Sequence, residues 1–332
     1  MNSVSVIVIT FNSASTIKDC LVSLKDQTLK DFEVILVDNN SHDHTGDVVE
    51  SIKPVLNFPL KIFYLDGNVG FAGGNNFALG QAAGRYIALL NPDAMAEDLW
   101  LEELMKSMDS HSEVGICASK IIDDKINVID SAGDIYTPVL KGFKRGEGES
   151  SQGFNDQEYI FGACGGAALY RRKMIEEIGF LDDDFFLIHE DTDLNFRAQL
   201  YGWKVLYVPT AVVHHKVRSS IGRMSDTAIY HTLRNSEWVR IKNIPSGVIL
   251  RCIPDLLIGA LTEFLYFGVK HKRLKLYLKA KADTIRMFSR TSKKRAMIMR
   301  NKKVSNQYLL NLMTPIWQKS FAVAKIKKFF RG

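Results

Sequence analysis

The sequence has few cysteines and lacks the glycine-rich signatures of common nucleotide sites. Its four cysteines are widely spaced and form no C-x-x-C pair, which argues against a disulfide framework or a zinc site and favours a reducing compartment. Neither G-x-G-x-x-G after the first apolar run nor G-x-x-x-x-G-K-[ST] occurs, so we expect neither a nicotinamide dinucleotide nor a P-loop nucleotide. Internal repeats and low-complexity tracts are also missing.

Long apolar runs are missing too. The most apolar piece, 253–269, has 17 residues and contains Asp255 and Glu263, whereas a membrane-spanning helix needs about 20 apolar residues. The N-terminal apolar run has no basic leader and no small-residue cleavage site, so we interpret it as a buried first strand rather than a signal peptide. These observations predict a cytoplasmic protein without a spanning helix.

Strand and helix patterns alternate through the first 120 residues. Apolar, β-rich runs occur at 4–10, 32–38, 61–65, 85–93 and 114–118. Helical spacing occurs at 13–26, 75–83 and 97–109. The alternation predicts an α/β fold with a doubly wound, mostly parallel sheet and flanking helices.

The later pattern is less regular. Residues 120–160 are rich in glycine and charge and indicate loops and short antiparallel strands. Further along, the sequence predicts a helix at 191–201, a strand at 204–209 that ends at Pro209, and a loop at 214–222.

Charge divides the chain into two parts. Residues 225–332 hold 23 basic and 5 acidic side chains, whereas residues 1–224 hold 20 basic and 32 acidic ones. We therefore predict an α/β domain at 1–224 and a basic, amphipathic helical region at 225–332. Such asymmetry favours an anionic membrane surface as partner, with 253–269 as an interfacial helix. A solvated helical bundle and a homodimer contact remain alternatives, and without a recognised module motif we expect no nucleic acid.

Polar residues follow the ends of four predicted strands, where open α/β sheets bind ligands. They are Thr10 and Asn12, then Asp38 and Asn40, then Asn68, Gly70, Gly73, Gly74 and Asn75, and last Asn91 and Asp93. Asp38 could accept hydrogen bonds from a base or ribose, and Asp93 suits Mg²⁺ or Mn²⁺ on a diphosphate. The glycines allow a close approach of the backbone to a ligand. His214 or His215 could add an imidazole ligand, and Arg218 could face phosphate oxygens.

Four ordered segments carry a resemblance to a known family. They are SVIVITFNSASTIKDCLVSLKDQTLKDFEVILVDNNSHDHT, NVGFAGGNNFALGQAAGRYIALLNPDA, GACGGAALYRR and EDTDLNFRAQLYGWKVLYVPTAVVHH, which fall within about residues 3–220. Together they resemble the family 2 inverting glycosyltransferases of the GT-A fold, with the nearest likeness to bacterial rhamnosyltransferase-type members. The resemblance implies a nucleotide-sugar donor.

The resemblance also implies roles by position. Thr10, Asn12, Asp38 and Asn40 would hold the nucleoside, and Asn68, Gly70, Asn75, Asn91 and Arg218 would line the nucleotide-sugar pocket. Asp93 would be the last acid of the D-x-D metal motif, in which Asn91 replaces the first acid and weakens the case for tight metal binding. His214 would be the later metal ligand, with His215 as second choice, and Gly165 and Gly166 would line the acceptor side.

Three carboxylates follow the apolar run 185–188, at positions 190, 191 and 193. A helix N-terminus that favours acidic residues is one explanation. In the family reading, Asp191 is the general base that takes the acceptor proton, and Glu190 orients it or contacts the acceptor. Asp193 lies four residues before Arg197, which predicts an ion pair along the helix.

The resemblance thus implies transfer of one sugar, with inversion, from a dTDP- or UDP-sugar to a hydroxyl, with rhamnose as the first candidate. The acceptor would be a growing glycan or a lipid-linked acceptor, with the enzyme peripheral on the inner face of a bacterial membrane. A sugar-1-phosphate nucleotidyltransferase would need a basic, Gly-rich loop after the first strand, where this chain has TFNSAST. A non-catalytic sugar-nucleotide or glycan-binding protein is the other alternative, because Asn91 replaces an acid of the metal motif. The presence of both Asp93 and Asp191 argues against it.

Overall fold

The computed structural model describes residues 3–216 and 225–315. Its first half is the predicted parallel arrangement, with sheet order β3-β2-β1-β4 and only parallel pairing. The strands are β1 (Val4–Thr10), β2 (Phe32–Asp38), β3 (Leu60–Tyr64) and β4 (Tyr86–Leu90). The connections carry α1 (Ile17–Lys25), α2 (Thr45–Ile52), η1 (Lys53–Val55) and α3 (Gly70–Leu79).

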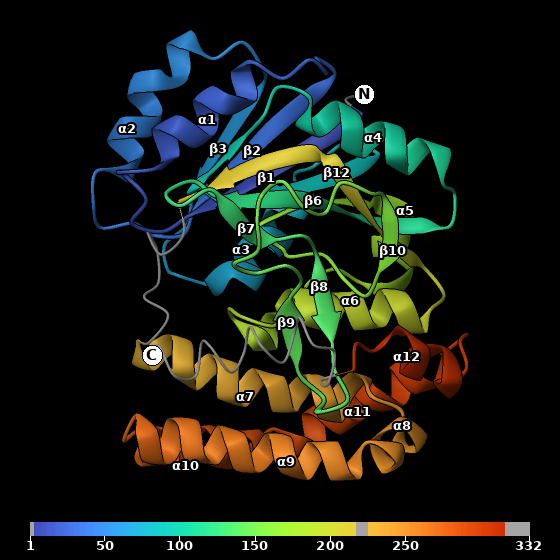
Figure 1. Ribbon diagram of the computed structural model, residues 1–332. Helices are drawn as coiled ribbons and strands as arrows, with labels where there is room; N and C mark the ends of the chain where they lie inside the picture. The colour runs from blue at the N-terminus through green and yellow to red at the C-terminus, as the bar shows by residue number, and fades with distance from the viewer. Residues whose placement is uncertain (1–2, 217–224, 316–332) are drawn as a thin grey trace.

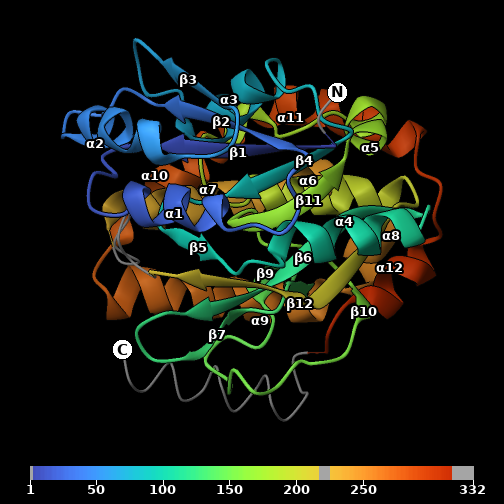
Figure 2. The same cartoon turned by 90° about the horizontal axis from the view of Figure 1, so that it is seen from above.

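The second half makes the sheet mixed. β11 (Ala167–Arg171) lies antiparallel between β4 and β6 (Val114–Asp123), and β12 (Lys204–His215) then runs parallel to β6. β5 (Ala94–Ala96), β7 (Val128–Ser131) and β10 (Glu158–Ile160) add antiparallel edges, and β8 (Asp134–Tyr136) with β9 (Gly142–Lys144) forms a separate hairpin. Figure 2 shows β3 at one edge of the sheet and β10 with β7 at the other. The predicted α/β class is confirmed.

Helices cover both faces of the sheet (Figure 1). α1, α2 and α4 (Trp100–Ser110) pack on one face. α3, α5 (Arg172–Ile178) and α6 (Glu190–Leu200) pack on the other, and η2 (Asp183–Phe185) precedes α6. α6 is unusual because ten of its residues are buried, among them Glu190, Asp193 and Arg197.

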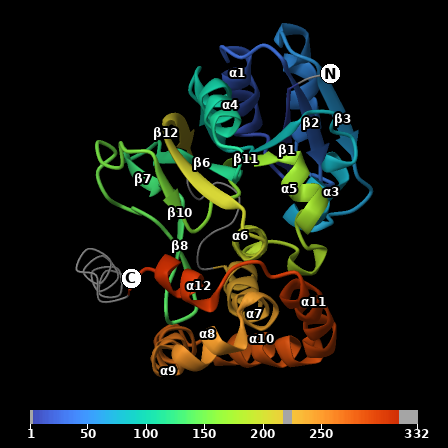
Figure 3. The same cartoon turned by 90° about the vertical axis from the view of Figure 1, so that its right-hand side faces the viewer.

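The chain after residue 225 is helical, as predicted, as far as the structure describes it. The elements are α7 (Asp226–Asn243), α8 (Ser246–Arg251), α9 (Ile253–Glu263), the π-helix η3 (Phe264–Lys270), α10 (Leu274–Arg286), α11 (Phe288–Arg300) and α12 (Asn306–Leu312). α7 lies between α6 and the layer of α10 and α11 (Figure 3). A core cluster joins Phe196 on α6 to Trp238 on α7 and Leu309 on α12. Within 3–216 and 225–315, none of the helices combines the length and the apolar character that crossing a bilayer requires.

Several predicted boundaries were wrong. α1 begins at Ile17 rather than residue 13, and α3 begins at Gly70 rather than residue 75, because the Asn68 side chain accepts a hydrogen bond from the Gly70 N–H at 2.8 Å. The predicted helical segment 253–269 is helical throughout, but it changes from the α-helix α9 to the π-helix η3 at residue 264.

The predicted strand end at Pro209 was also wrong. β12 continues to His215, and its register against β6 shifts between Val208 and Val212. Pro209 falls in this bulge, where its missing N–H removes no ladder hydrogen bond. His214 and His215 are therefore strand residues and not part of a loop.

Candidate functional site

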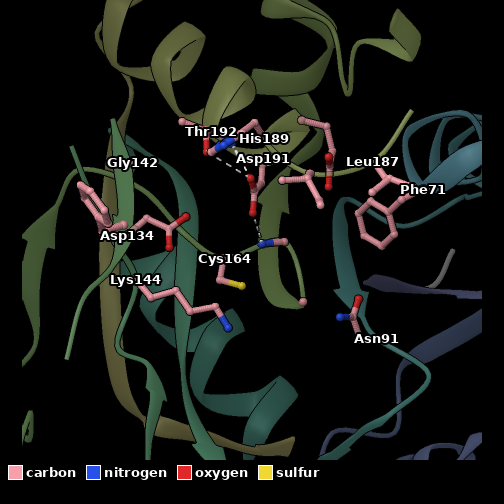
Figure 4. A pocket seen from close by; sticks show the side chains of 15 residues that line it. Phe71, Asn91, Asp134, Gly142, Lys144, Cys164, Leu187, His189, Asp191 and Thr192 are labelled. Carbon is pink, nitrogen blue, oxygen red and sulfur yellow. Dashed lines mark hydrogen bonds between the residues drawn. The ribbon is translucent and has the colours of Figure 1, made fainter. Parts of the chain in front are cut away.

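A cavity of about 360 Å³ opens beside the N-terminus of α6 (Figure 4). Its walls come from five parts of the chain that are far apart in sequence. They are Phe71 on α3, Asn91 after β4, the β8–β9 hairpin with Asp134 and 142–144, the loop 164–166, and the segment 187–192. The structure therefore brings Asn91, Gly165, Gly166, Glu190 and Asp191 to the wall of one cavity.

The Asp191 carboxylate lies in this cavity and is held by backbone donors (Figure 4). Its Oδ2 accepts a hydrogen bond from the Gly165 N–H at 3.0 Å, and its Oδ1 accepts one from the Thr192 N–H at 2.6 Å. A Cβ at position 165 would lie 3.3 Å from the Asp191 Cβ, so glycine leaves the carboxylate room. Its place in the first turn of α6 also favours a negative charge.

The backbone before Asp191 is strained. Phe186, Ile188 and His189 all have positive φ, at 65°, 65° and 72°. A left-handed conformation costs about 1–2 kcal/mol for each non-glycine residue, and a β-branched side chain such as that of Ile188 rarely adopts it. Strain of this kind persists only where surrounding contacts enforce it, and it concentrates at functional sites.

The loop 160–166, on the other side of Asp191, is fixed by buried amides of α6. The Asn195 side chain donates to the Ala163 carbonyl oxygen at 2.9 Å and accepts from the Ala163 N–H at 3.1 Å. Gln199 donates to the carbonyl oxygens of Ile160 and Phe161 at 3.1 and 2.9 Å. α6 therefore positions both Asp191 and the loop that hydrogen-bonds to it.

Glu190 is a second carboxyl group on the cavity wall. It is 6% exposed, and its Oε2 has no hydrogen-bond partner. Burial and the neighbouring charge of Asp191 raise the pKa of Glu190 to about 8. Glu190 is therefore mostly protonated at neutral pH, which spares Asp191 a second negative charge next to it.

Two acidic residues that the sequence analysis missed lie on the β7–β9 side. Burial, and then the charge of Asp191, raises the pKa of Asp134 well above its usual range. Asp130 accepts hydrogen bonds from Lys144 Nζ at 2.7 Å, and its Oδ2 lies 3.0 Å from His215 Nδ1. Asp130 follows only two apolar residues, Val128 and Ile129, and lies inside β7, so the sequence carried no clear signal for it.

The predicted nucleoside residues gather at the ends of β1 and β2. The Thr10 hydroxyl donates to Asp38 Oδ2 at 2.9 Å, and Ser41 donates to the same carboxylate through its N–H at 2.8 Å and its hydroxyl at 2.7 Å. Asn12 joins this group because its N–H donates to the Ser41 hydroxyl at 2.9 Å. Asn40, with φ of 64°, lies in the same turn.

The residues near α3 have largely internal contacts. Asn68 accepts from the side chain of Asn39 at 3.1 Å, and Asn75 donates to the Phe71 carbonyl oxygen at 2.8 Å. A Cβ at Gly70 would collide with the Phe186 carbonyl oxygen, and Gly70 has φ of 78°. The close approach predicted for a ligand at Gly70 is therefore taken by the loop that precedes Asp191.

At Gly73 and Gly74, as at Gly70, protein atoms occupy the space that was predicted for a ligand. Their close neighbours are protein side chains, since a Cβ at either position would lie 3.0 Å from Val69 or Ile9. Asn75 is 1% exposed and points along its own helix. Arg218 lies outside the described residues.

The two histidines of β12 point to opposite faces of the strand, because successive strand residues alternate. His215 Nε2 lies 3.1 Å from Asp93 Oδ1, whereas His214 Nε2 lies 3.0 Å from Glu97 Oε1. The structure therefore places His215, the second choice of the sequence analysis, beside Asp93. Burial opposes charging of His215, but hydrogen bonds to Asp130 and Asp93 outweigh it and raise the pKa of His215 to about 9.

Asp93 and His215 could supply two protein ligands to a divalent cation. Asp93 would supply a carboxylate, and His215 would supply an imidazole after a bound cation displaces the proton on Nε2. Asp130 orients that imidazole from its other nitrogen. Residues 3–216 and 225–315 hold no cluster of three metal-ligating side chains. Mg²⁺ and Mn²⁺ commonly complete such a set with phosphate oxygens and water, so a cation here would depend on the bound nucleotide.

Comparison with solved structures gives neighbours of the same fold. The structure of S. aureus TarS in complex with UDP-GlcNAc has a TM-score of 0.58 and 19% sequence identity, and the match covers 94% of this chain and 93% of that one. A mannosyltransferase from Pyrobaculum calidifontis in complex with GDP-Man and Mn²⁺ has a TM-score of 0.53 and 18% identity over 90% of this chain and 85% of that one. At these identities the likeness shows the fold alone.

Sequence comparison gives bacterial relatives. EpsH of Bacillus subtilis is 26% identical over 239 residues, which are 66% of this chain and 62% of that protein. The poly-beta-1,6-N-acetyl-D-glucosamine synthase of Staphylococcus epidermidis is 21% identical over 67% of this chain and 52% of its own length. An N-acetylglucosaminyl-diphospho-decaprenol L-rhamnosyltransferase of Mycobacterium tuberculosis is 24% identical over 71% of this chain and 86% of its own length. The chain thus spans between about half and two thirds of the first two relatives.

The family follows from the N-terminal part of the chain. Residues 5–179 match the model described as glycosyl transferase family 2, which is more than half of the chain. This region contains β1 to β4 with their polar ends, Asn91 and Asp93, and the glycine pair of the loop 164–166. The chain therefore belongs to glycosyl transferase family 2 and has the GT-A fold.

Proposed function

We propose that this chain transfers a sugar, with inversion, from a nucleoside diphosphate donor to a hydroxyl group of a glycan. The observation that carries the proposal is the Asp191 carboxylate, which two backbone N–H groups hold in place inside the cavity. A carboxylate fixed in this way can take the proton of an attacking hydroxyl. The strained loop before it fixes its position more tightly than a flexible loop would.

Donor and acceptor would meet in this cavity from different sides. The nucleoside would bind at Thr10, Asn12 and Asp38, and the diphosphate near Asn91 and Asp93. The acceptor would enter past Gly165, Gly166 and the β8–β9 hairpin, so that its hydroxyl reaches Asp191. Phe71 and Leu187 on the wall would exclude water, which competes with the acceptor.

A divalent cation fits the proposal through Asp93 and His215. Mg²⁺ or Mn²⁺ bound there would offset the negative charge that develops on the leaving diphosphate. Asn91 supplies an amide where the family motif has a second acid, so we expect weak cation binding without nucleotide.

The sugar is the least constrained part of the proposal. dTDP-rhamnose is the first candidate, supported by the mycobacterial rhamnosyltransferase among the relatives. UDP-N-acetylglucosamine is the second, because a structural neighbour binds it. A lipid-linked acceptor is also suggested by the name of the mycobacterial relative, and it would place the enzyme at the inner face of the bacterial membrane.

A donor panel tests the proposal. Purified full chain is incubated with Mg²⁺ or Mn²⁺ and several dTDP- and UDP-sugars, and release of nucleoside diphosphate is followed. We expect turnover with one donor and its loss in Asp93→Ala, with Asp156→Ala at an exposed site as the matched control. If calorimetry shows that no donor binds, the chain is not a nucleotide-sugar enzyme, and a glycan-binding role becomes the better supported one.

A further inference from the structure

The exposed apolar side chains of this protein are concentrated in one region. Of the 21 large apolar side chains exposed in the described part of the chain, 13 lie between residues 250 and 297. On α9, Leu257 and Leu261 are four residues apart and are 65% and 59% exposed. On α10, Leu274 and Leu278 repeat this spacing at 44% and 56% exposure. A gathering of this kind marks an interaction surface rather than ordinary surface scatter.

This apolar face lies on the far side of the molecule from the sheet. α9 and α10 form the outermost layer, with α7 between them and α6 (Figures 1 and 3). The side chains of α10 that face inward pack on α7, where Ala280 is buried against Ile229 and Leu233. The outward side chains are therefore not needed to hold the helices on the protein.

Basic side chains accompany the apolar face. Residues 246–300 carry 13 Lys and Arg side chains against three acidic ones. Lys272, Lys275 and Lys279 are exposed on or just before α10, beside Leu274 and Leu278. A second copy packed face to face would bring two such positive surfaces together, which is unfavourable. An anionic lipid surface matches both the charge and the apolar character.

We propose that the outward face of α9, η3 and α10 binds an anionic lipid bilayer at its surface. Leucine and isoleucine side chains of α9 and α10 enter the boundary between headgroups and acyl chains, and the neighbouring lysines contact anionic headgroups. Bilayer binding would bring the enzyme to a lipid-linked acceptor, so the purpose of the binding rests on the proposed function. The binding itself can be measured without any turnover.

The face is connected to the cavity by the β8–β9 hairpin. Val139 in the hairpin turn lies against Gly259 of α9, where a Cβ would be only 3.0 Å from the Val139 Cβ. Lys141 makes an ion pair with Glu263 at the end of α9. Residues 142–144 of the same hairpin line the cavity that holds Asp191. A bilayer docked on α9 is therefore adjacent to the hairpin that lines the acceptor side.

Vesicle flotation of the full chain tests this proposal. Vesicles of phosphatidylcholine are compared with vesicles that also contain phosphatidylglycerol, at low salt. We expect binding to the second kind only. Leu257→Glu with Leu261→Glu should lower the partition coefficient at least about tenfold, because it puts charge on the inserted face. Lys272→Gln with Lys275→Gln should also lower it about tenfold, through the lost attraction to anionic headgroups.

Matched controls show whether binding depends on this face in particular. Val55→Glu with Ile126→Glu changes two side chains of similar exposure, 58% and 67%, in the catalytic part and should leave binding within about twofold. A chain that ends after residue 315 should keep most of the affinity. Light scattering reports the oligomeric state, and donor hydrolysis without vesicles should be equal in the leucine variant and the parent chain.

Several outcomes would overturn the proposal. They are no binding of the full chain to anionic vesicles, unchanged binding by the leucine variant, or binding lost only when 316–332 is removed. A dimer that the leucine variant converts to a monomer would instead assign the face to a second copy. Because donor hydrolysis is measured separately, failure of bilayer binding leaves the proposed enzymatic function standing.

Discussion

The side-chain amide of Asn235 on α7 lies 2.7 Å from the carbonyl oxygen of Ile188, three residues before Asp191. The same Nδ2 also donates toward the carbonyl oxygens of Phe185 and Leu187, at 3.0 and 2.8 Å. Asn235 is fully buried. The two N–H bonds of this one amide therefore face three carbonyl oxygens of the strained loop, so at least one hydrogen is shared between two of them. These hydrogen bonds offset part of the cost of the positive φ angles there.

We predict that Asn235→Ala lowers kcat at least about tenfold while the nucleoside diphosphate still binds with nearly its original affinity. Without the amide, the carbonyl groups lose buried partners at about 1–3 kcal/mol, so the loop relaxes and Asp191 shifts. Calorimetry gives the nucleotide affinity and steady-state kinetics give kcat.

Two further variants distinguish the effect of losing the Asn235 hydrogen bonds from the effect of losing its side-chain volume. Asn235→Asp keeps the shape but faces the carbonyl oxygens with an acceptor, so it should be at least as damaging as alanine. Ser236→Ala, the neighbouring buried site on α7, should leave kcat within about twofold. If the Asp variant retained full kcat, the amide would not position Asp191.

The two histidines of β12 give a second prediction. His215→Ala should weaken Mn²⁺-dependent nucleotide binding about 10- to 100-fold, because His215 and not His214 lies beside Asp93. His214→Ala is the matched control, since its imidazole lies against Glu97. Calorimetry with Mn²⁺ and with EDTA measures both. An equal loss in the two variants would contradict the assignment.

Glu190 gives a pH-dependent prediction. Its pKa is about 8 in the folded protein against 4.5 as the ordinary value, because of burial and the charge of Asp191. Between these pH values the folded state holds more protons than the unfolded state, so the free energy of unfolding falls as pH rises. The contribution of the protonated carboxyl is complete below pH 4.5 and is lost as pH rises through about 8.

Glu190→Gln should therefore gain stability relative to the parent chain on going from about pH 6 to about pH 9, by at least about 1 kcal/mol. Urea unfolding at the two pH values measures this difference. Glu176→Gln, at an exposed site on α5, is the matched control. A gain that does not depend on pH would mean that Glu190 is not protonated in the folded protein.

The sequence was sufficient for the elements that depend on local patterning. The buried strands β1, β2 and β4 are mostly apolar runs, and their polar ends lie at the edge of the sheet where the sequence predicts a ligand site. The ion pair between Asp193 and Arg197 also followed from spacing, and the structure confirms it at 2.8 Å. These features need no information from distant parts of the chain.

Other features depended on contacts between distant segments. Polar residues are spread evenly along α6, so its sequence did not indicate that the helix is almost fully buried. The burial arises because α7 covers the outer side of α6, where Lys242 and Asn243 hydrogen-bond to Asp193. The choice between His214 and His215 required knowing that β12 continues past Pro209. No local pattern indicates that Asn235 contacts the loop before Asp191.

The basic C-terminal region shows the same limit. Its positive charge suggested an external anionic partner, but part of that charge is used within the protein. Lys242 pairs with Asp182 at 2.5 Å, and Lys294 pairs with Asp182 and Asp184 at 2.5 and 2.6 Å. The domain boundary at residues 224 and 225 stays a prediction. The core cluster around Trp238 includes residues from both sides of it, so the two parts pack against each other.

The most direct test of the proposed mechanism is the effect of Asp191→Asn on turnover and donor affinity together. Once the donor panel has identified the sugar nucleotide, kcat and the donor Kd are measured for the parent chain, Asp191→Asn and the exposed control Asp156→Asn. A general base predicts a fall in kcat of about 10²- to 10⁴-fold with donor Kd nearly unchanged. A kcat for Asp191→Asn close to that of the parent chain would contradict the assignment of Asp191 as the base.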